Sequence, residues 1–257
     1  MGLTFYKYQA TGNDFVLIDN RSGQVDPDDY VFFEQLCHRR FGVGADGVIL
    51  LGSDADTDFA MHYYNADGRP GSMCGNGGRA VVRFAQHLGL VQQQAHFVAI
   101  DGLHEASMEQ DQIWLKMGAV SQIEALGPEA YYLDTGSPHY VRWCQGVQAL
   151  DVYTEGRAVR YSDRFRAVGT NVNFAEELAP GQLRIRTYER GVEDETYSCG
   201  TGATAVACVY RQLRGYAGPS VQLHTAGGLL TVEFRTSGIW LGGPALCVFR
   251  GEWIDRN

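Results

Sequence analysis

The stretch Met73-Cys74-Gly75-Asn76-Gly77-Gly78-Arg79-Ala80 places a cysteine on a turn of small residues. Apolar residues then recur at helical spacing, so the sequence predicts a helix that begins directly after Cys74. The first N–H groups of a helix have no partner within it and carry the positive end of the helix dipole. A thiol in such a place has a lowered pKa, and a carboxylate can bind the N–H groups beside it.

A second stretch of the same kind is Ser198-Cys199-Gly200-Thr201-Gly202-Ala203-Thr204-Ala205. The run that follows Cys199 has almost no polar face, so we expect this second helix to be buried on all sides. Two thiols at helix N-termini in one chain suggest a pair that acts on a shared anionic substrate.

Landmarks around the two cysteines recur at a nearly constant offset of 124 or 125 positions. The pairs are Thr11-Gly12-Asn13 with Thr135-Gly136-Ser137, Gly44-Ala45-Asp46 with Gly169-Thr170-Asn171, Tyr64–Gly68 with Tyr188–Gly191, and Cys74 with Cys199. A constant offset predicts a duplicated domain. We expect one half at residues 1–120, with the tail 245–257 packed back on it, and the other at 121–244.

Most segments that flank the two helices alternate apolar and polar residues, as strands do. A buried helix among strands predicts an α+β fold. We expect two pseudo-symmetric domains, each a curved antiparallel sheet wrapped round a central helix, with the active site in the cleft between them. Nearer the N-terminus, Asp26 and Pro27 suit the N-cap and first position of a helix, which predicts a surface helix over 27–40.

The composition is that of an ordinary soluble globular protein, with 257 residues, 45% apolar and 20% charged. The net charge of −9 argues against a nucleic-acid or anionic-membrane partner. Residues 1–20 do not form a signal peptide, and no apolar stretch is long enough to span a membrane, so we expect an intracellular protein. The six cysteines and seven histidines show no metal-site spacing, and we expect no metal.

Two thiols suit proton transfer at a carbon atom. Inverting an amino-acid α-carbon requires a base on one face and an acid on the other, and a thiolate with a thiol can serve because the thiol pKa can be tuned toward neutrality. Nothing in the sequence signals pyridoxal phosphate or flavin, so we expect no cofactor.

Other polar residues recur near the cysteines. His139 could tune a thiol, and Glu189-Arg190 could hold the amine and carboxylate of a substrate. Three asparagines at repeat positions are candidates for substrate binding, although each also suits a turn: Asn13, Asn65 and Asn171.

Together these motifs resemble the diaminopimelate epimerase family. The matching segments run in order along nearly the whole chain: Gly12-Asn13-Asp14-Phe15, Gly42-x-Gly44-x-Asp46, Asn65-Ala66-Asp67-Gly68, Met73–Gly77, Pro138-His139, Tyr188-Glu189-Arg190-Gly191 and Cys199–Gly202. The resemblance implies a cofactor-independent epimerase that interconverts LL- and meso-2,6-diaminopimelate. It also implies a cytoplasmic homodimer that serves lysine and peptidoglycan precursor biosynthesis.

By this resemblance Cys74 and Cys199 are the acid and base thiols, and His139 and Glu189 tune them. The implied substrate-binding residues are Asn13, Asn65, Gly75, Asn76, Ser137, Asn171, Glu189, Arg190, Gly200 and Thr201. The chain departs from the family pattern at Ser137, where many members have asparagine, and at Gly47, where some have glutamine.

Three alternatives remain open from the sequence. A racemase of proline or hydroxyproline, or an isomerase related to phenazine biosynthesis, would share the fold. A two-domain binding protein for a small dicarboxylic amino acid would carry the cysteines incidentally. The two cysteines could also form a redox pair.

Overall fold

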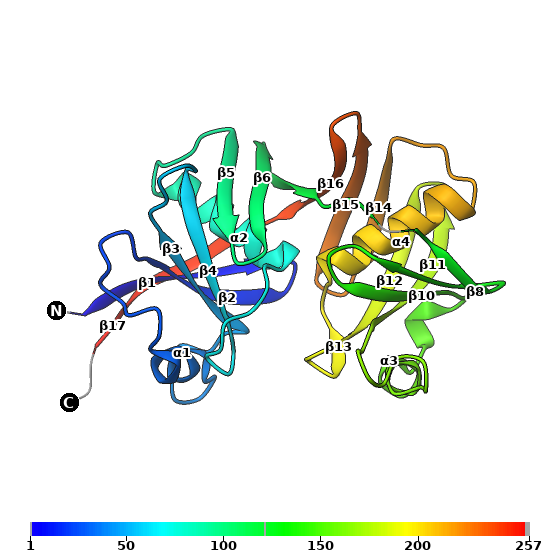
Figure 1. Cartoon of the computed structure of the whole chain (residues 1–257), viewed down its shortest axis with the longest axis horizontal. Helices are drawn as coiled ribbons and strands as arrows, with labels where there is room; N and C mark the ends of the chain where they lie inside the picture. Colours follow the sequence, from blue (N-terminus) through cyan, green and yellow to red (C-terminus); the bar gives the residue numbers. More distant parts are fainter. Residues whose placement is uncertain (1, 121, 255–257) are drawn as a thin grey trace. The chain divides into compact units, whose positions relative to one another are not determined.

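The computed structural model describes residues 2–120 and 122–254 (Figure 1). The chain divides into two compact units, one formed by Met1–Leu115 with Gly243–Asn257 and the other by Lys116–Gly242. The predicted boundary at residue 121 and the end of the predicted tail, 255–257, lie outside the described residues.

The described part of the first unit holds two helices and the strands around them. Its elements are β1 (Leu3–Ala10), β2 (Asn13–Asp19), α1 (Tyr30–Cys37), β3 (Gly47–Gly52), β4 (Phe59–Asn65), α2 (Gly75–His87), β5 (Gln94–Ala99), β6 (Gly102–Glu109), β7 (Gln112–Met117) and β17 (Leu246–Trp253). The unit boundary falls within β7.

The second unit repeats this order with a few additions. Its elements are β8 (Glu124–Gly127), β9 (Ala130–Asp134), β10 (Pro138–Trp143), the 3₁₀ turn η1 (Val147–Ala149), α3 (Val152–Arg160), β11 (Asn171–Ala179), β12 (Gln182–Glu189), β13 (Asp194–Thr196), α4 (Gly200–Leu213), β14 (Ser220–Thr225), β15 (Gly228–Arg235) and β16 (Gly238–Pro244).

Strand pairing follows one scheme in both units. The order is β17–β1–β2–β3–β4–β5–β6–β7 in the first and β8–β9–β10–β11–β12–β14–β15–β16 in the second. The parallel pairs are β2–β3 and β4–β5 in the first unit and β10–β11 and β12–β14 in the second. The α+β class is therefore confirmed, but both sheets are mixed, not purely antiparallel as predicted. Parallel neighbours need a crossover, and a helix supplies each one.

The register of the strands confirms the duplication. Phe15 lies opposite Gly47, and the residues 124 positions later, His139 and Asn171, also lie opposite each other. The same shift relates the pair Val48–Tyr64 to Val172–Tyr188. A one-residue slip would turn every side chain to the other face of a sheet, so shared register means that equivalent positions face equivalent surroundings.

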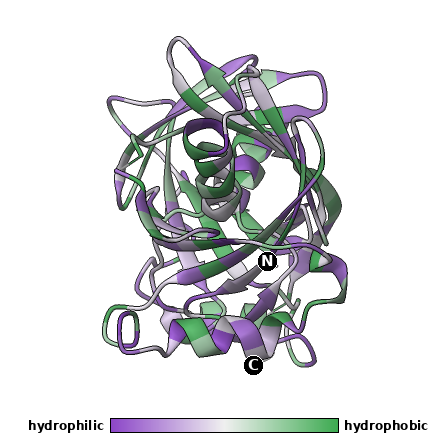
Figure 2. Cartoon of the chain, turned by 90° about the vertical axis from the view of Figure 1, so that its right-hand side faces the viewer, coloured by the Kyte–Doolittle hydropathy of each residue, from purple (hydrophilic) through white to green (hydrophobic). Residues whose placement is uncertain are grey.

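A helix fills the centre of each unit. Helix α2 packs against β1, β2, β3, β4 and β17, and α4 packs against β9, β10, β11 and β15. Figure 2 looks into the second unit, where strands surround the apolar α4 seen end-on. Its residues from Ala203 to Tyr210 are all buried, as predicted from its lack of a polar face. Each large apolar side chain buried in this way stabilises the fold by roughly 1.5–3 kcal/mol.

Helix α1 is shorter than the predicted 27–40, and its start was placed wrongly. The N-cap is Asp29, whose side chain accepts a hydrogen bond from the Phe32 N–H at 3.1 Å. Asp26 instead accepts from the Asp28 N–H within a preceding turn. Each aspartate can serve as a cap, and the second one prevails because Phe33 and Leu36 then face the core.

Among the described residues, no helix combines the length and apolar character needed to cross a membrane.

Candidate active site: two equivalent half-sites

Cys74 is the N-cap residue of α2, where the sequence placed it. Its Sγ accepts a hydrogen bond from the Gly77 N–H at 3.2 Å. Gly75, Asn76 and Gly77 form the buried first turn of the helix. A negative charge on the sulfur would therefore be stabilised by a direct N–H donor and by the helix dipole.

The first turn of α2 rests on a buried arginine. The Arg79 side chain is 0% exposed and donates to the Gly75 carbonyl at 3.2 Å and to Asn76 Oδ1 at 2.9 Å. It also donates to Thr11 Oγ1 at 3.0 Å, and Thr11 lies in the turn between β1 and β2. Because a guanidinium only donates, Asn76 must turn its oxygen toward Arg79 and its NH₂ group away.

The other candidates of this unit lie at strand ends. Asn13 opens β2, and its Oδ1 is buried without a hydrogen-bond partner among the described residues. Asn65 closes β4 and lies opposite Gly47. A buried acceptor without a donor needs an explanation, and a donor on a bound ligand supplies one.

The acidic residues of two motifs shared with the family, Asp14 and Asp46, form ion pairs with side chains of the same unit. Asp14 pairs with Lys7 at 2.6 Å and with Arg39 at 2.7 Å, and Arg39 also pairs with Asp46 at 2.8 Å. The Lys7 amine donates to the Gly44 carbonyl. Burial opposes ionisation of Asp14, but hydrogen bonds from Arg39 and Lys7 prevail and hold its pKa at about 2. This charge cluster fixes the glycine-rich loop against β2.

Gly47 departs from the family pattern for a visible reason. A methyl group at this position would lie 2.6 Å from Tyr63 Cε2 and also meet the Tyr64 carbonyl. The Tyr63 ring thus occupies the space that a longer side chain at position 47 would need.

Cys199 is the N-cap residue of α4, again where the sequence placed it. Its side chain is buried, and Sγ lies 3.5 Å from Thr201 Oγ1. The Thr201 carbonyl accepts a hydrogen bond from Thr135 Oγ1 at 3.1 Å. A methyl group on Gly202 would lie 3.3 Å from Cys199 Sγ and would collide with Asn173 Oδ1, so the Asn173 amide lies beside the start of α4.

Asn173 belongs to a buried polar chain that includes His139. Its Nδ2 donates to His139 Nδ1 at 3.1 Å and to the Tyr140 carbonyl, and its Oδ1 accepts from Thr187 Oγ1 at 3.0 Å. Burial, and then the charge of Arg190, lower the His139 pKa to about 3. His139 is therefore neutral, accepts at Nδ1 and carries its proton on Nε2. That nitrogen is buried and has no partner among the described residues.

Asn171 connects the remaining candidates of the second unit. Its Nδ2 donates to Ser137 Oγ at 2.9 Å and to the Pro138 carbonyl, and its Oδ1 accepts from the Arg190 N–H at 2.9 Å. The Arg190 side chain donates to the Val168 carbonyl at 3.2 Å and has no ion-pair partner in the described part of the chain. Glu189 accepts from Thr196 Oγ1 at 2.8 Å.

The structure thus gathers three groups of predicted residues. They are Cys74 with Gly75 and Asn76, Cys199 with Gly200 and Thr201, and Ser137 with Asn171 and Arg190. It also adds residues that the sequence analysis missed: Thr11, Arg79, Asn173 and Thr187. Asn173 follows Asn171 by two positions on one strand, so it faces the same side, and this spacing could have revealed it.

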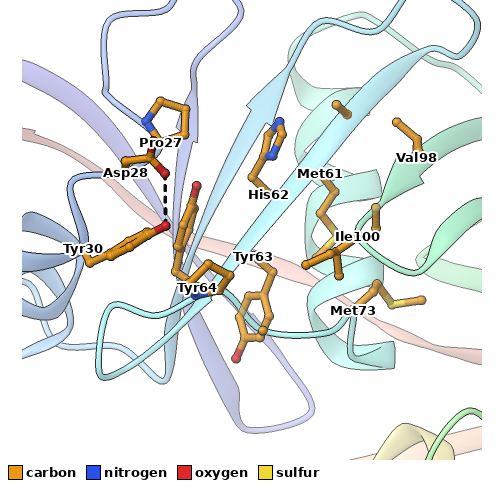
Figure 3. Close-up of a pocket in the computed structure, with 14 residues that line it drawn as sticks. Pro27, Asp28, Tyr30, Met61, His62, Tyr63, Tyr64, Met73, Val98 and Ile100 are labelled. Atoms are coloured by element: carbon orange, nitrogen blue, oxygen red, sulfur yellow. Dashed lines mark hydrogen bonds between the residues drawn. The ribbon is translucent and has the colours of Figure 1, made fainter.

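We call the surroundings of Cys74 in the first unit the first half-site and those of Cys199 in the second unit the second half-site. A pocket of about 360 Å³ lies beside the first half-site (Figure 3). It forms where β4 and β5 separate, because these strands pair only at Phe59–Phe97 and Ala60–Val98. Met61, Met73 and Ile100 line one side of it. None of the predicted site residues lines this pocket, so the helix N-termini define the candidate site better than the pocket does.

Comparison with known proteins shows the family of this chain. The family model described as diaminopimelate epimerase matches residues 5–123 and 131–246. The diaminopimelate epimerase of Flavobacterium psychrophilum is 46% identical over 253 residues, which cover 96% of this chain and 98% of that protein. The diaminopimelate epimerase of Chlorobaculum tepidum is 42% identical, with 94% and 98% covered.

Solved structures share the fold at low identity. A PhzF-family phenazine biosynthesis protein of Bacillus anthracis has a TM-score of 0.79 at 13% identity and covers 99% of this chain and 100% of its own. A probable proline racemase of Agrobacterium radiobacter K84 has a TM-score of 0.72 at 15% identity, with 97% and 92% covered. These two likenesses concern the fold alone, whereas the matches in sequence cover nearly the whole chain. The chain therefore belongs to the diaminopimelate epimerase family and is an epimerase, one of the isomerases.

Proposed function

We propose that this epimerase interconverts LL- and meso-2,6-diaminopimelate with two cysteine thiols and no cofactor. Its relatives in Flavobacterium psychrophilum and Chlorobaculum tepidum are named for this substrate. The reaction would serve lysine and peptidoglycan precursor biosynthesis in the cytoplasm.

One observation carries the proposal. Cys74 and Cys199 are the N-cap residues of α2 and α4, the central helices of two units with the same strand order. Packing alone does not explain why each helix starts with a cysteine followed by glycine. A pair of equivalent thiols is what inversion at one carbon requires, because each face needs its own proton carrier.

In the proposed step the thiolate of one cysteine removes the α-proton, and the thiol of the other delivers a proton to the opposite face. The C–H bond broken on one face is replaced by one formed on the other. The two sulfurs exchange protonation states, so no proton or electron is gained or lost. The reverse reaction begins with these roles exchanged.

The carboxylate next to the reacting carbon would bind backbone N–H groups at the two helix starts, those of Gly75, Asn76, Gly200 and Thr201. Negative charge that develops on the α-carbon spreads onto this carboxylate, and preorganised donors stabilise it. Asn13, Asn65, Asn171, Glu189 and Arg190 would hold the distal amino-acid group. In this arrangement Ser137 and Asn171 position the Arg190 backbone through the hydrogen bonds described above.

Proton exchange at the α-carbon in D₂O, followed by NMR, tests the proposal. LL-diaminopimelate would be incubated with the reduced protein beside L-proline and L-glutamate, with no added cofactor. We expect deuterium to enter diaminopimelate alone while the meso isomer forms. Exchange into proline would keep the chemistry and overturn the substrate, and no exchange in any of the three would overturn the function.

We also propose that the protein is a homodimer, as the family resemblance implies. Sedimentation equilibrium at micromolar concentration should give twice the mass of the chain. A monomer that retains full turnover would contradict this.

A further inference from the structure

Arg79 is a costly residue to bury inside this unit. Its side chain is 0% exposed, and its Nε has no hydrogen-bond partner among the described residues. An apolar side chain of similar size would avoid the cost of removing a charge from water. A buried and incompletely satisfied cation therefore calls for a functional reason.

The contacts of Arg79 join two segments that carry candidate site residues. Thr11 and Gly12 form a two-residue hairpin turn with φ of 48° and 85°. A β-branched residue rarely adopts a positive φ, so Thr11 is a strained choice for this turn. Its hydroxyl accepts from Arg79 at 3.0 Å, 68 positions along the chain. This bond holds the turn directly before Asn13 against the start of α2.

We propose that Arg79 is a positioning residue that holds Asn76 and the Thr11 turn around Cys74, and that its charge makes Cys74 the ionised thiol of the resting protein. Burial lowers the pKa of Arg79 to about 10, so the guanidinium keeps its proton at neutral pH. The charge of the Cys74 thiolate raises the Arg79 pKa and so opposes the effect of burial. That attraction is mutual, so the guanidinium favours the Cys74 thiolate to the same extent.

The equivalent position in the second unit carries no charge. Thr204 lies 125 positions after Arg79, is fully buried, and donates to the Gly200 carbonyl, as Arg79 donates to the Gly75 carbonyl. Beside Cys199 the buried groups are neutral, namely the Asn173 amide and, bonded to it, the His139 imidazole. Within the described part of the chain, Cys74 has a buried cation in its own helix start, and Cys199 does not.

The elements packed against α2 also carry other titratable groups. The elements of this unit that pack against α2 carry these titratable groups: Tyr6, Lys7 and Tyr8 on β1, Asp14 and Asp19 on β2, His62, Tyr63 and Tyr64 on β4, Cys247, Arg250 and Glu252 on β17, and Arg83 and His87 on α2 itself. Lys7 is paired with Asp14 at 2.6 Å. None of these groups contributes to the Arg79 pKa, whereas Cys74 does.

Alkylation of the full chain by iodoacetamide tests the inference without any substrate. The rates at Cys74 and Cys199 would be followed by peptide mass spectrometry from pH 5 to 10, which gives a pH midpoint for each thiol. We expect the Cys74 midpoint to be the lower. Arg79→Gln should raise it and slow Cys74 alkylation at pH 7 by roughly tenfold, while the Cys199 midpoint stays unchanged.

Two further variants separate charge from structure. Arg79→Lys keeps a cation and should retain most of the wild-type midpoint. Arg83→Gln removes a cation one turn further along α2, where Arg83 contacts Gln86 at 2.7 Å, and should move neither midpoint. A Cys199 midpoint below that of Cys74 in the wild type would overturn the inference, as would an unchanged Cys74 midpoint in Arg79→Gln. If Arg79→Gln fails to fold, the wild-type order and Arg79→Lys still decide.

The catalytic role of an ionised Cys74 rests on the proposed function, in which this thiolate would be the base that first removes the α-proton. The ionisation itself does not depend on that function. The two can fail separately. Absence of α-proton exchange in the wild type would overturn the epimerase reaction on diaminopimelate and leave the alkylation midpoints as they are.

Discussion

The two half-sites share one backbone plan and differ in their side chains. Beside Gly77, near Cys74, lie the apolar side chains of Ile49 and Met61. At the place equivalent to Ile49, beside Gly202 and Cys199, lies the amide of Asn173.

Two further pairs extend the contrast. Phe15 and His139 occupy the same register position, and the charged Arg79 has the neutral Thr204 as its counterpart. The first half-site thus combines apolar walls with one buried cation, and the second combines a neutral histidine with hydrogen-bonding amides and hydroxyls. A symmetric backbone brings two equivalent thiols to helix starts, and asymmetric side chains can give them different resting charges.

Removal of either thiol should have the largest effect. Cys74→Ala and Cys199→Ala should each lower the rate of epimerisation by at least ~10³-fold, because each variant leaves one face of the carbon without its proton carrier. Turnover of LL-diaminopimelate measures this, with circular dichroism to check folding. Cys144→Ala, at a half-buried cysteine outside both helix starts, is the matched control and should stay active. Near-normal turnover in either site variant would refute the two-base reaction.

The second largest effect should come from Arg190, which has no charged counterpart in the first unit. The position 124 residues earlier is Ala66. Arg190→Ala should raise KM for diaminopimelate by roughly 10- to 100-fold, because a charge-assisted contact to the distal carboxylate is lost. Steady-state kinetics measure it. Arg166→Ala, which removes a surface ion pair with Asp163, serves as the control. An unchanged KM would remove Arg190 from the site.

Two glycines offer a direct comparison of the half-sites. A methyl group on Gly202 collides with Asn173, so Gly202→Ala should lower the free energy of unfolding by about 1–3 kcal/mol. On Gly77 it would lie 3.3 Å from Cys74 Sγ and Met61 Cε, and the higher helix propensity of alanine offsets part of that crowding. Urea unfolding of both variants measures the difference. Equal losses would mean that the amide near Cys199 yields as readily as the thioether near Cys74.

Acid should lower the stability gradually, and the first loss should come from His139 in the second unit. The pKa of His139 is about 3 in the folded protein, below its ordinary value of 6.5. Between these pH values His139 is protonated in the unfolded chain and neutral in the folded one. Stability should therefore fall as the pH drops below about 6.5, by roughly 1 kcal/mol per pH unit. Asp14, with a pKa of about 2 against 3.8, adds its loss only below about pH 4.

Urea unfolding at pH 7, 5 and 4 measures this dependence. His139→Gln should flatten the loss between pH 6.5 and 4, and Asp14→Asn should leave that range unchanged. A wild-type stability that does not vary over this range would contradict a neutral buried His139.

Much of this protein could be predicted from short local signals. A cysteine before glycines and an apolar run predicts an N-capping thiol, and the constant offset predicts two repeated units, because both depend on residues that are close in sequence or regularly spaced. The start of α1 was predicted wrongly, because Asp26 and Asp29 are both adequate caps and only burial of Phe33 and Leu36 decides between them.

The tertiary structure decided what depends on contacts between distant segments. The bond between Arg79 and Thr11 spans 68 positions, and that between His139 and Asn173 spans 34. The sequence gives no sign that Arg79 is buried, because arginine usually lies in solvent. Local spacing determined where the thiols lie, and long-range packing determined which charges and dipoles surround them, because a field at an atom depends on distance in space and not on separation along the chain.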